Sequence, residues 1–344
     1  MNGVVEFVQA GAAVSVQDRG RPGHRAIGVP LAGAADPVLM ACANALLAQA
    51  AGLAVLEVAL LGPALRASVA PVRVAVVGDF APVLTPYGGG PMTLPSWRSI
   101  TLKVGDQLTL GVCRSGMGYL AFAGGVNVPP VLGSRSTYAR AALGGIAGRA
   151  PAVGDQLNCG PGDGPELQAS QAFLHAAGPL RVLPGPQDDH FDSAAWQLFV
   201  DSDYSVTRDS DRMGLRLQGP VLRHRPDKGA DIVSEAVVPG AIQVPGAGQP
   251  IVLGVDAQTI GGYAKIATLI SADLPRLAHA RPGSVLRFAV VTRAQALAAR
   301  RAQNAALAAW VRRLAPVRAS GEPDPVALYA GNLISGMIDA HTDL

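Results

Sequence analysis

Short apolar segments separated by glycine and proline run through most of this 344-residue chain, which contains 41 glycines and 27 prolines. Short runs that end in turn-forming residues are typical of strands, and this spacing favours barrels or sandwiches over a doubly wound sheet. The expected strands are residues 4–8, 55–60, 72–77, 100–102, 108–112, 119–123, 180–183, 204–207, 215–217, 251–255 and 286–291. The pattern therefore predicts a mainly β fold.

Three segments carry helix signals instead. Asp36 is an N-cap residue followed by proline, and Gly52 ends that helix. A second helix is expected over 189–199, and a third over 293–314 after the cap Thr292. One apolar face of the third helix consists of Leu307, Trp310, Val311 and Leu314. A few peripheral helices should therefore surround the strands.

The length of the chain predicts two domains, each large enough for its own core. We place the boundary near 172–179, where glycine- and proline-containing stretches flank a short connection. The expected division is an N-terminal β-barrel-like domain over 1–175, a C-terminal domain over 176–292, and a helix with a tail over 293–344.

Charge and hydropathy exclude several classes of protein. The net charge is +3, the basic residues form no run of five, and aromatic residues make up 5%, so a nucleic-acid partner is not expected. Residues 37–56 carry no charge, but polar residues and glycine interrupt them, which favours a helix and a strand over a membrane span. Glu6 lies where a signal peptide would be basic and apolar. A soluble, cytoplasmic protein without a membrane partner is expected.

Cysteine and histidine spacing gives no local support for cross-links or metals. Cys42, Cys113 and Cys159 are far apart and odd in number, which fits a reducing compartment and argues against disulfides and a zinc knuckle. The six histidines form no HxxxH or HxH pattern. No metal site is therefore expected.

The segment 256–277 carries the sharpest functional signal. An apolar run ends at Asp256, and the polar or small residues Gln258, Thr259, Gly261, Gly262, Tyr263 and Lys265 follow before the next apolar run. Paired glycines in a turn allow positive φ and close approach of a ligand. Lys265 is one of three lysines among 28 basic residues, and a compact ammonium suits a carbonyl or a carboxylate. We expect a glycine-rich turn beside a partly buried lysine; the alternative is a solvated hairpin tip.

Two further loops combine charged and hydroxyl side chains. Residues 16–37 place Asp18 and Arg19 between glycines ahead of the first helix, which suits an anion or carboxylate. The alternative is a structural pair between Asp18 and an arginine. Residues 120–140 place Arg135 and Ser136 in a hydroxyl-rich loop, for which turn and cap chemistry is the alternative.

The C-terminal half carries two more candidates. Asp211 and Arg212 lie on a turn between two expected strands, where a solvated hairpin tip is again the alternative, and Gln243 lies in an extended segment bounded by prolines. The sequence contains no GxSxG elbow, phosphate loop or dinucleotide fingerprint. Catalysis by a Ser-His-Asp triad therefore has no specific support.

The order of these motifs carries a family resemblance. They run QDRGRPGHRAIGVP…GAADP, AGGVNVPPVLGSRSTY, LPGPQDDHF, SVTRDSDRMGLRL, SEAVVPGAIQVP and GQPIVLGVDAQTIGGYAKIAT. Over about residues 5–292 this order closely resembles the family called 5-oxoprolinase C subunit, allophanate hydrolase subunit 2 or biotin-dependent carboxyltransferase. The resemblance implies two cyclophilin-like β-barrel domains, the second over 176–292, and a partner chain, the B subunit, of related fold.

The resemblance also implies a function. The chain would be the C subunit of an ATP-dependent 5-oxoprolinase, which opens 5-oxo-L-proline to L-glutamate together with its A and B subunits. Lys265 and Gln258 would stabilise charge on the carbonyl oxygen, and Arg212, beside Asp211, or Arg135 would hold the carboxylate. The substrate-binding set would be Gln243, Thr259, Gly261, Gly262, Tyr263, Arg135, Ser136, Asp18 and Arg19. ATP would be used by the complex, with neither metal nor biotin attached to this chain.

Two alternative functions remain. One is a carboxyltransferase half-site for a urea-like substrate, with carboxybiotin supplied by another chain; in larger urea carboxylases the two units are fused. The other is a non-catalytic regulatory protein that binds a partner resembling the B subunit. Four positions depart from the usual family pattern, namely Ala32, Ala247, Ile260 and Ala264. These departures bear on substrate preference more than on fold.

Overall fold

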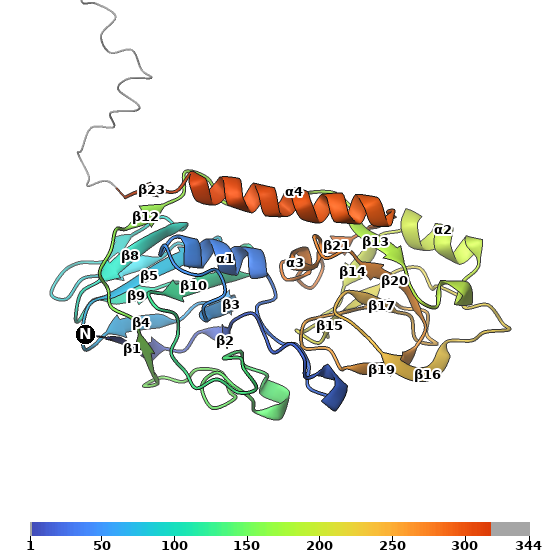
Figure 1. The fold of residues 1–344 in the computed structure, drawn as a ribbon, viewed down its shortest axis with the longest axis horizontal. Helices are drawn as coiled ribbons and strands as arrows, with labels where there is room; N and C mark the ends of the chain where they lie inside the picture. The colour runs from blue at the N-terminus through green and yellow to red at the C-terminus, as the bar shows by residue number, and fades with distance from the viewer. Residues whose placement is uncertain (1, 318–344) are drawn as a thin grey trace, which may run out of the picture.

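Strands dominate residues 2–317, the part of the chain that this computed structural model describes (Figure 1). Sheets of six and seven strands are formed mainly by residues 3–168, the N-terminal half. An eight-stranded sheet and a two-stranded ribbon are formed by residues 180–290, the C-terminal half. The prediction of a mainly β fold with a few peripheral helices is confirmed.

Two antiparallel sheets pack face to face in the N-terminal half. The six-stranded sheet has the order β11 (Gln156–Cys159), β1 (Gly3–Gln9), β4 (Ala64–Ala67), β9 (Gln107–Thr109), β6 (Val83–Thr85) and β7 (Met92–Thr93). The seven-stranded sheet has the order β2 (Ala12–Gln17), β3 (Val55–Leu61), β10 (Gly118–Phe122), β5 (Val72–Val77), β8 (Arg98–Leu102), β12 (Leu167–Gln168) and β23 (Ala315–Pro316). Strand β5 is buried throughout, because one face meets the six-stranded sheet and the other lies under helix α1 (Pro37–Ala45).

The eight-stranded sheet of the C-terminal half is a nearly closed barrel. Its order is β21 (Val285–Leu286), β14 (Tyr204–Val206), β15 (Gly214–Gln218), β18 (Ile251–Leu253), β17 (Ala241–Gln243), β20 (Lys265–Leu269), β13 (Leu180–Pro184) and β22 (Phe288–Val290). Only Arg287 separates β21 from β22, and these strands pair with β14 and β13 at opposite edges of the sheet. One segment therefore closes the barrel, and the side chain of Phe288 is buried in its core.

Helices cover the outside of the sheets. They are α1, α2 (Ser193–Asp201), α3 (Leu274–Leu277) and α4 (Arg293–Arg312), with 3-10 turns η1 (Arg25–Ile27), η2 (Ala139–Ala141) and η3 (Asp188–His190). Asp36 caps α1 as expected, accepting from the amides of Val38 and Leu39 at 3.0 Å. The helix ends well before Gly52, because the Asn44 side chain donates to the carbonyls of residues 51 and 53 and holds a turn there. Helix α2 begins at Ser193 rather than 189, since η3 precedes it.

Helix α4 connects the two halves, along the upper edge of the molecule in Figure 1. Gln303 Nε2 donates to the carbonyl of Ala272 at 2.8 Å, and Trp310 Nε1 donates to the carbonyl of Gln171 at 2.8 Å. Leu307, Trp310 and Leu314 pack on the core under α1, whereas Val311, predicted on the same face, is exposed. The part of the predicted tail beyond residue 317 lies outside the described residues.

Two further findings bear on the class of protein. Among residues 2–317, no helix combines the length and the apolar character that crossing a bilayer requires. The three cysteines all lie in this range, and each is a buried free thiol.

Candidate functional site

The environment of Lys265 differs from the sequence expectation. Lys265 begins strand β20 and is 2% exposed. Gly261 and Gly262 lie in strand β19 (Ile260–Tyr263), which pairs with β16 (Asp231–Ala236), and neither glycine has a positive φ. The predicted diglycine turn and partly exposed lysine were therefore wrong. The segment 260–263 was misread as a turn because it pairs with β16, and the spacing of residues within the segment does not reveal that partner.

The two glycines nevertheless allow close packing. A Cβ at Gly261 would overlap Nε2 of Gln243, and a Cβ at Gly262 would lie 3.1 Å from Oγ of Ser234. In this ribbon the absence of a side chain makes room for neighbouring polar groups rather than permitting an unusual backbone.

Five polar side chains surround the start of β20, and we call them the lysine cluster: Gln187, Glu235, Gln243, Gln258 and Lys265. The Lys265 ammonium lies 2.9 Å from Glu235 Oε1, and Gln187 Nε2 donates to the same oxygen at 2.9 Å. These contacts, the one from Gln187 first, lower the pKa of Glu235 below its usual value. The cluster therefore contains an ammonium held in place by an ionised carboxylate.

Gln243 brings an unused donor to the lysine cluster. It is 2% exposed and lies opposite Lys265 in the β17–β20 pairing. Its Oε1 accepts from Gln258 Nε2 at 3.5 Å, while its buried Nε2 has no partner among the described residues. An ammonium and an unpaired amide donor suit an oxygen that develops negative charge. The structure thus assembles three predicted residues and adds Gln187 and Glu235, which the local pattern did not single out as candidates.

Other predicted residues of the C-terminal half lie outside the lysine cluster. Thr259 is buried and accepts at its carbonyl from the amide of Val237 at 3.1 Å, whereas Tyr263 is 42% exposed. Asp211 is exposed, and its carboxylate pairs with Arg140 at 3.1 Å. Asp211 and Arg212 lie on the turn between β14 and β15, as expected.

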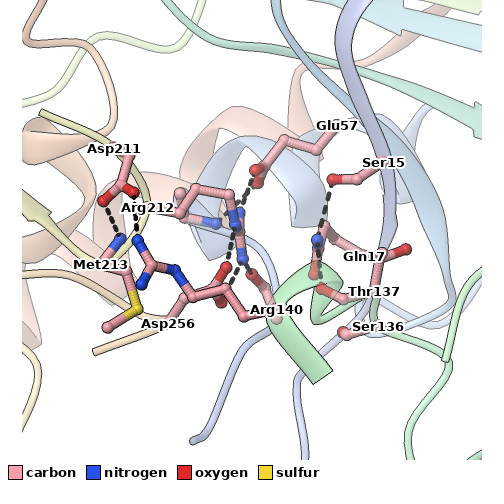
Figure 2. Close-up of polar contacts among 12 residues, drawn as sticks. Ser15, Gln17, Glu57, Ser136, Thr137, Arg140, Asp211, Arg212, Met213 and Asp256 are labelled. Carbon is pink, nitrogen blue, oxygen red and sulfur yellow. Dashed lines mark hydrogen bonds and ion pairs between the residues drawn. The ribbon is translucent and has the colours of Figure 1, made fainter. Parts of the chain in front are cut away.

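Arg212 connects the two halves, as Figure 2 shows. Its Nε and Nη2 donate to both oxygens of Asp256 at 2.8 and 3.0 Å, and Nη1 pairs with Glu57 of strand β3. Nη2 also donates to the carbonyl of Gly33 at 2.7 Å. Burial alone would lower the pKa of Arg212, but the two carboxylates raise it. We call Glu57, Arg212 and Asp256 the arginine junction. The contacts of Arg212 occupy most of its guanidinium donors, which favours a structural role for this residue.

The arginine junction continues into the N-terminal half. Glu57 Oε2 accepts from the Tyr119 hydroxyl at 2.8 Å and from the amide of Ala35 at 2.7 Å. The Tyr119 hydroxyl in turn accepts from the amide of Asp36 at 2.8 Å. Burial and the Glu57 charge raise the pKa of Tyr119 well above its usual value, so this hydroxyl stays a neutral donor. A buried polar chain therefore runs from Asp256 to Asp36.

Asp36 meets two histidines at the end of this chain. Its Oδ2 accepts from Nε2 of His175 at 2.6 Å and from Nε2 of His279 at 2.8 Å. Both histidines line a cavity of about 220 Å³. Ligand spacing gave no hint of this group, since its members come from three distant segments. Among the described residues, this is the group of His, Cys, Asp or Glu side chains whose ligand atoms lie close enough together to hold a metal ion.

Asp18 organises a separate group in the N-terminal half. Its Oδ1 accepts from the hydroxyls of Ser134, at 2.6 Å, and of Ser136, and its Oδ2 accepts from the amide of Arg135 at 2.6 Å. No ion pair between Asp18 and an arginine occurs within residues 2–317, so its charge is satisfied by hydroxyls and amides. Arg19 is exposed and lies beside Gly52.

The arginines near Asp18 differ in how many of their guanidinium donors have hydrogen-bond acceptors. Arg135 Nε donates to the carbonyl of Val128 at 2.9 Å. Arg21 is fully buried and donates from Nη2 to the carbonyl of Ser136, but its Nε and Nη1 have no partner among the described residues. Within residues 2–317 no hydrogen bond or ion pair joins the Asp18 group to the lysine cluster.

Comparison with known proteins gives consistent matches over most of the chain. Residues 27–290 match the family described as carboxyltransferase domain, subdomain A and B. The chain is 37% identical to the 5-oxoprolinase C subunit of Escherichia coli (strain K12), covering 88% of this chain and 96% of that protein. It is 33% identical to the 5-oxoprolinase C subunit of Haemophilus influenzae (strain ATCC 51907 / DSM 11121 / KW20 / Rd), covering 87% and 94%. The crystal structure of K. lactis urea amidolyase superposes with a TM-score of 0.80 at 27% identity, over 89% of this chain and 20% of that one.

Proposed function

Because this chain belongs to the family of carboxyltransferase domains, subdomain A and B, we propose that it is the C subunit of a multi-chain, ATP-dependent 5-oxoprolinase. The observation that carries the proposal is the match to the E. coli 5-oxoprolinase chain along 96% of that protein at 37% identity. The urea amidolyase match, by contrast, covers 20% of the larger chain. The chain thus corresponds to a whole subunit in the first case and to one part of a fused enzyme in the second.

In the proposed reaction the complex opens the lactam of 5-oxo-L-proline to L-glutamate. The lactam is a resonance-stabilised amide, so its opening is coupled to ATP hydrolysis. The lysine cluster would stabilise negative charge on the lactam oxygen through the Lys265 ammonium and through Nε2 of Gln243, which has no partner among the described residues. This role is supported by the fixed position of the Lys265 ammonium, which Glu235 and the buried β20 backbone hold in place.

Of the two arginines expected to hold the substrate carboxylate, Arg135 has the freer guanidinium, and it belongs to the Asp18 group rather than to the lysine cluster. The arginine junction engages Arg212 with two carboxylates and a carbonyl, whereas among the described residues only Nε of Arg135 has an acceptor. We assign ATP use to the complex and leave open which subunit binds it; the sequence of this chain contains no phosphate loop. The A and B subunits would complete the catalytic unit, which we place in the cytoplasm.

The test is reconstitution. We expect this chain to co-purify with the A and B subunits and to support 5-oxoproline-dependent ATP hydrolysis only in their presence. Robust turnover by the isolated chain would contradict the division of labour, and a reconstituted complex without 5-oxoproline turnover would contradict the assigned reaction.

Lys265→Met tests the site within the reconstituted complex. Removing one preorganised electrostatic donor should lower turnover roughly a hundredfold, and Lys265→Arg should also be impaired because a planar guanidinium cannot replace a point charge. Methionine can fill the buried volume, and Glu235 is 45% exposed and can be solvated, so the melting temperature should change little. Lys103→Met, at an exposed lysine, is the matched control. Parental turnover in Lys265→Met would remove this residue from the site.

A second candidate function is carboxyl transfer to a urea-like nitrogen. It is favoured by the TM-score of 0.80 to urea amidolyase, and it requires carboxybiotin carried by another chain. Assaying the complex with urea and a carboxylated biotin carrier distinguishes it from lactam opening. Binding to a partner resembling the B subunit without either activity would instead support the non-catalytic, regulatory alternative.

A further inference from the structure

We propose that Asp36, His175 and His279 form a binding site for a divalent transition-metal ion between the two halves of the protein. Asp36 precedes α1, His175 lies in the connection before β13, and His279 follows α3. One ligand atom from each residue lies within 4.8 Å of the other two. This proposal does not depend on the enzymatic function proposed above.

Contacts around Asp36 and His279 orient their ligand atoms, whereas Nδ1 of His175 has no partner among the described residues. Asp36 Oδ1 accepts from two amides of α1, which leaves Oδ2 directed at the histidines. His279 Nδ1 lies 2.9 Å from the carbonyl of Ser115, so a proton on Nδ1 donates there and leaves Nε2 free to bind a metal. Histidine ligands usually have such a carbonyl or carboxylate behind the ring, which fixes the tautomer and raises ligand basicity.

A metal ion would also suit the charge and the arrangement of these three side chains. Asp36 is fully buried, and one of its oxygens faces two imidazole nitrogens. A metal ion would bring positive charge to this buried carboxylate.

The cavity beside the histidines supplies the space that binding needs. Ligand atoms on a tetrahedral ion with bonds of about 2.0–2.1 Å lie roughly 3.3 Å apart. The present separations of 2.6 and 2.8 Å are shorter, so the Nε2 atoms of His175 and His279 must withdraw from Asp36 Oδ2 by about 0.7 and about 0.5 Å. Both line the cavity of about 220 Å³, together with Phe173, Trp97 and Ser115. The cavity would also leave a coordination position open to water or a small ligand.

The donor set indicates the class of ion. Two imidazoles and one carboxylate suit Zn²⁺, Co²⁺ or Fe²⁺, whereas Mg²⁺ and Ca²⁺ prefer oxygen ligands. Such an ion would cross-link the N-terminal half, the connection and the C-terminal half through one residue of each.

The test uses the full chain after removal of metal with a chelator. We expect isothermal titration with Zn²⁺ to show one site, Co²⁺ to give the visible absorption of a tetrahedral or five-coordinate centre, and Zn²⁺ to raise the melting temperature. His279→Gln and His175→Gln should each weaken Zn²⁺ binding by at least about tenfold and abolish the thermal shift. His224→Gln and His190→Gln, at histidines outside the group, should bind like the parent.

Two results would overturn the proposal. One is the absence of Zn²⁺ and Co²⁺ binding at micromolar concentrations, which would leave Asp36 and the histidines as a hydrogen-bonded clamp. The other is equal binding by the parent, His175→Gln and His279→Gln, which would place the metal elsewhere. Two separate histidine variants keep the test decisive if one of them does not fold.

Discussion

Replacing Arg212 with methionine should destabilise the protein, because it leaves two buried carboxylates without their counter-ion. Glu57 and Asp256 side chains are 3% and 11% exposed, and the guanidinium is their ion-pair partner at the junction of the halves. Methionine keeps part of the apolar volume but donates no hydrogen bond. The loss of stability therefore reports mainly the ion pairs of the arginine junction rather than apolar packing.

The size of the effect follows from burial. Removing one member of a buried ion pair costs about 3–5 kcal/mol, because a desolvated charge remains behind. The Arg212 side chain is 26% exposed, so water can partly replace it, and the lower end of that range, about 3 kcal/mol, applies. At about 2 °C per kcal/mol for a large domain, the melting temperature should fall by roughly 6 °C.

Thermal and urea unfolding of matched variants would test this reasoning. Glu57→Gln and Asp256→Asn, combined with Arg212→Met, should recover part of the loss, since no unpaired carboxylate then remains. Arg225→Met is the control, because its pair with Asp227 is exposed on both sides. If Arg212→Met unfolds like Arg225→Met, the arginine junction does not hold the halves together. Loss of turnover at unchanged stability would restore Arg212 to the substrate site.

Two further substitutions follow from close packing and from a lowered pKa. Gly261→Ala should distort the lysine cluster, because the new Cβ overlaps Nε2 of Gln243, whereas Gly90→Ala, with open space around it, should match the parent in turnover and melting. Burial alone would raise the pKa of Asp273, but hydrogen bonds from Arg181 lower it, so the folded state binds this proton less readily than the unfolded chain. Its stabilisation should be present above about pH 4 and be lost as pH falls, and Asp273→Asn should flatten that acid limb in melts at several pH values.

Strands that carry a buried apolar pattern could be predicted from the sequence. β5 and β10 are buried on both faces and consist mainly of apolar residues, with Arg73 as the one charged residue of β5. β16 was missed because all of its residues are exposed or partly exposed and they show no alternation of buried and exposed positions. β19 was misread because its pairing with β16, rather than its own composition, makes Gly261 and Gly262 extended.

The candidate site was predictable only in part for a similar reason. The local pattern singled out Lys265 because lysine is rare in this chain, and Arg212 because it is a charged turn residue between two apolar runs. Their partners Glu235 and Glu57 come from strands elsewhere in the chain, and nothing in the spacing relates them. The two histidines that meet Asp36 are separated from it by 139 and 243 positions, beyond any ligand motif.

The segment that closes the C-terminal barrel, residues 285–290, has a consequence for synthesis on the ribosome. β13 and β14 emerge long before β21 and β22, yet each has one edge that only residues 285–290 occupy. Until those residues emerge, the nascent chain presents two open strand edges, and Phe288 is not yet available to stack on Phe199 at 4.7 Å. Open edges are templates for pairing with other chains. A polypeptide that stops before residue 285 should therefore depend on chaperones, whereas one extended only a few residues further should close its own barrel.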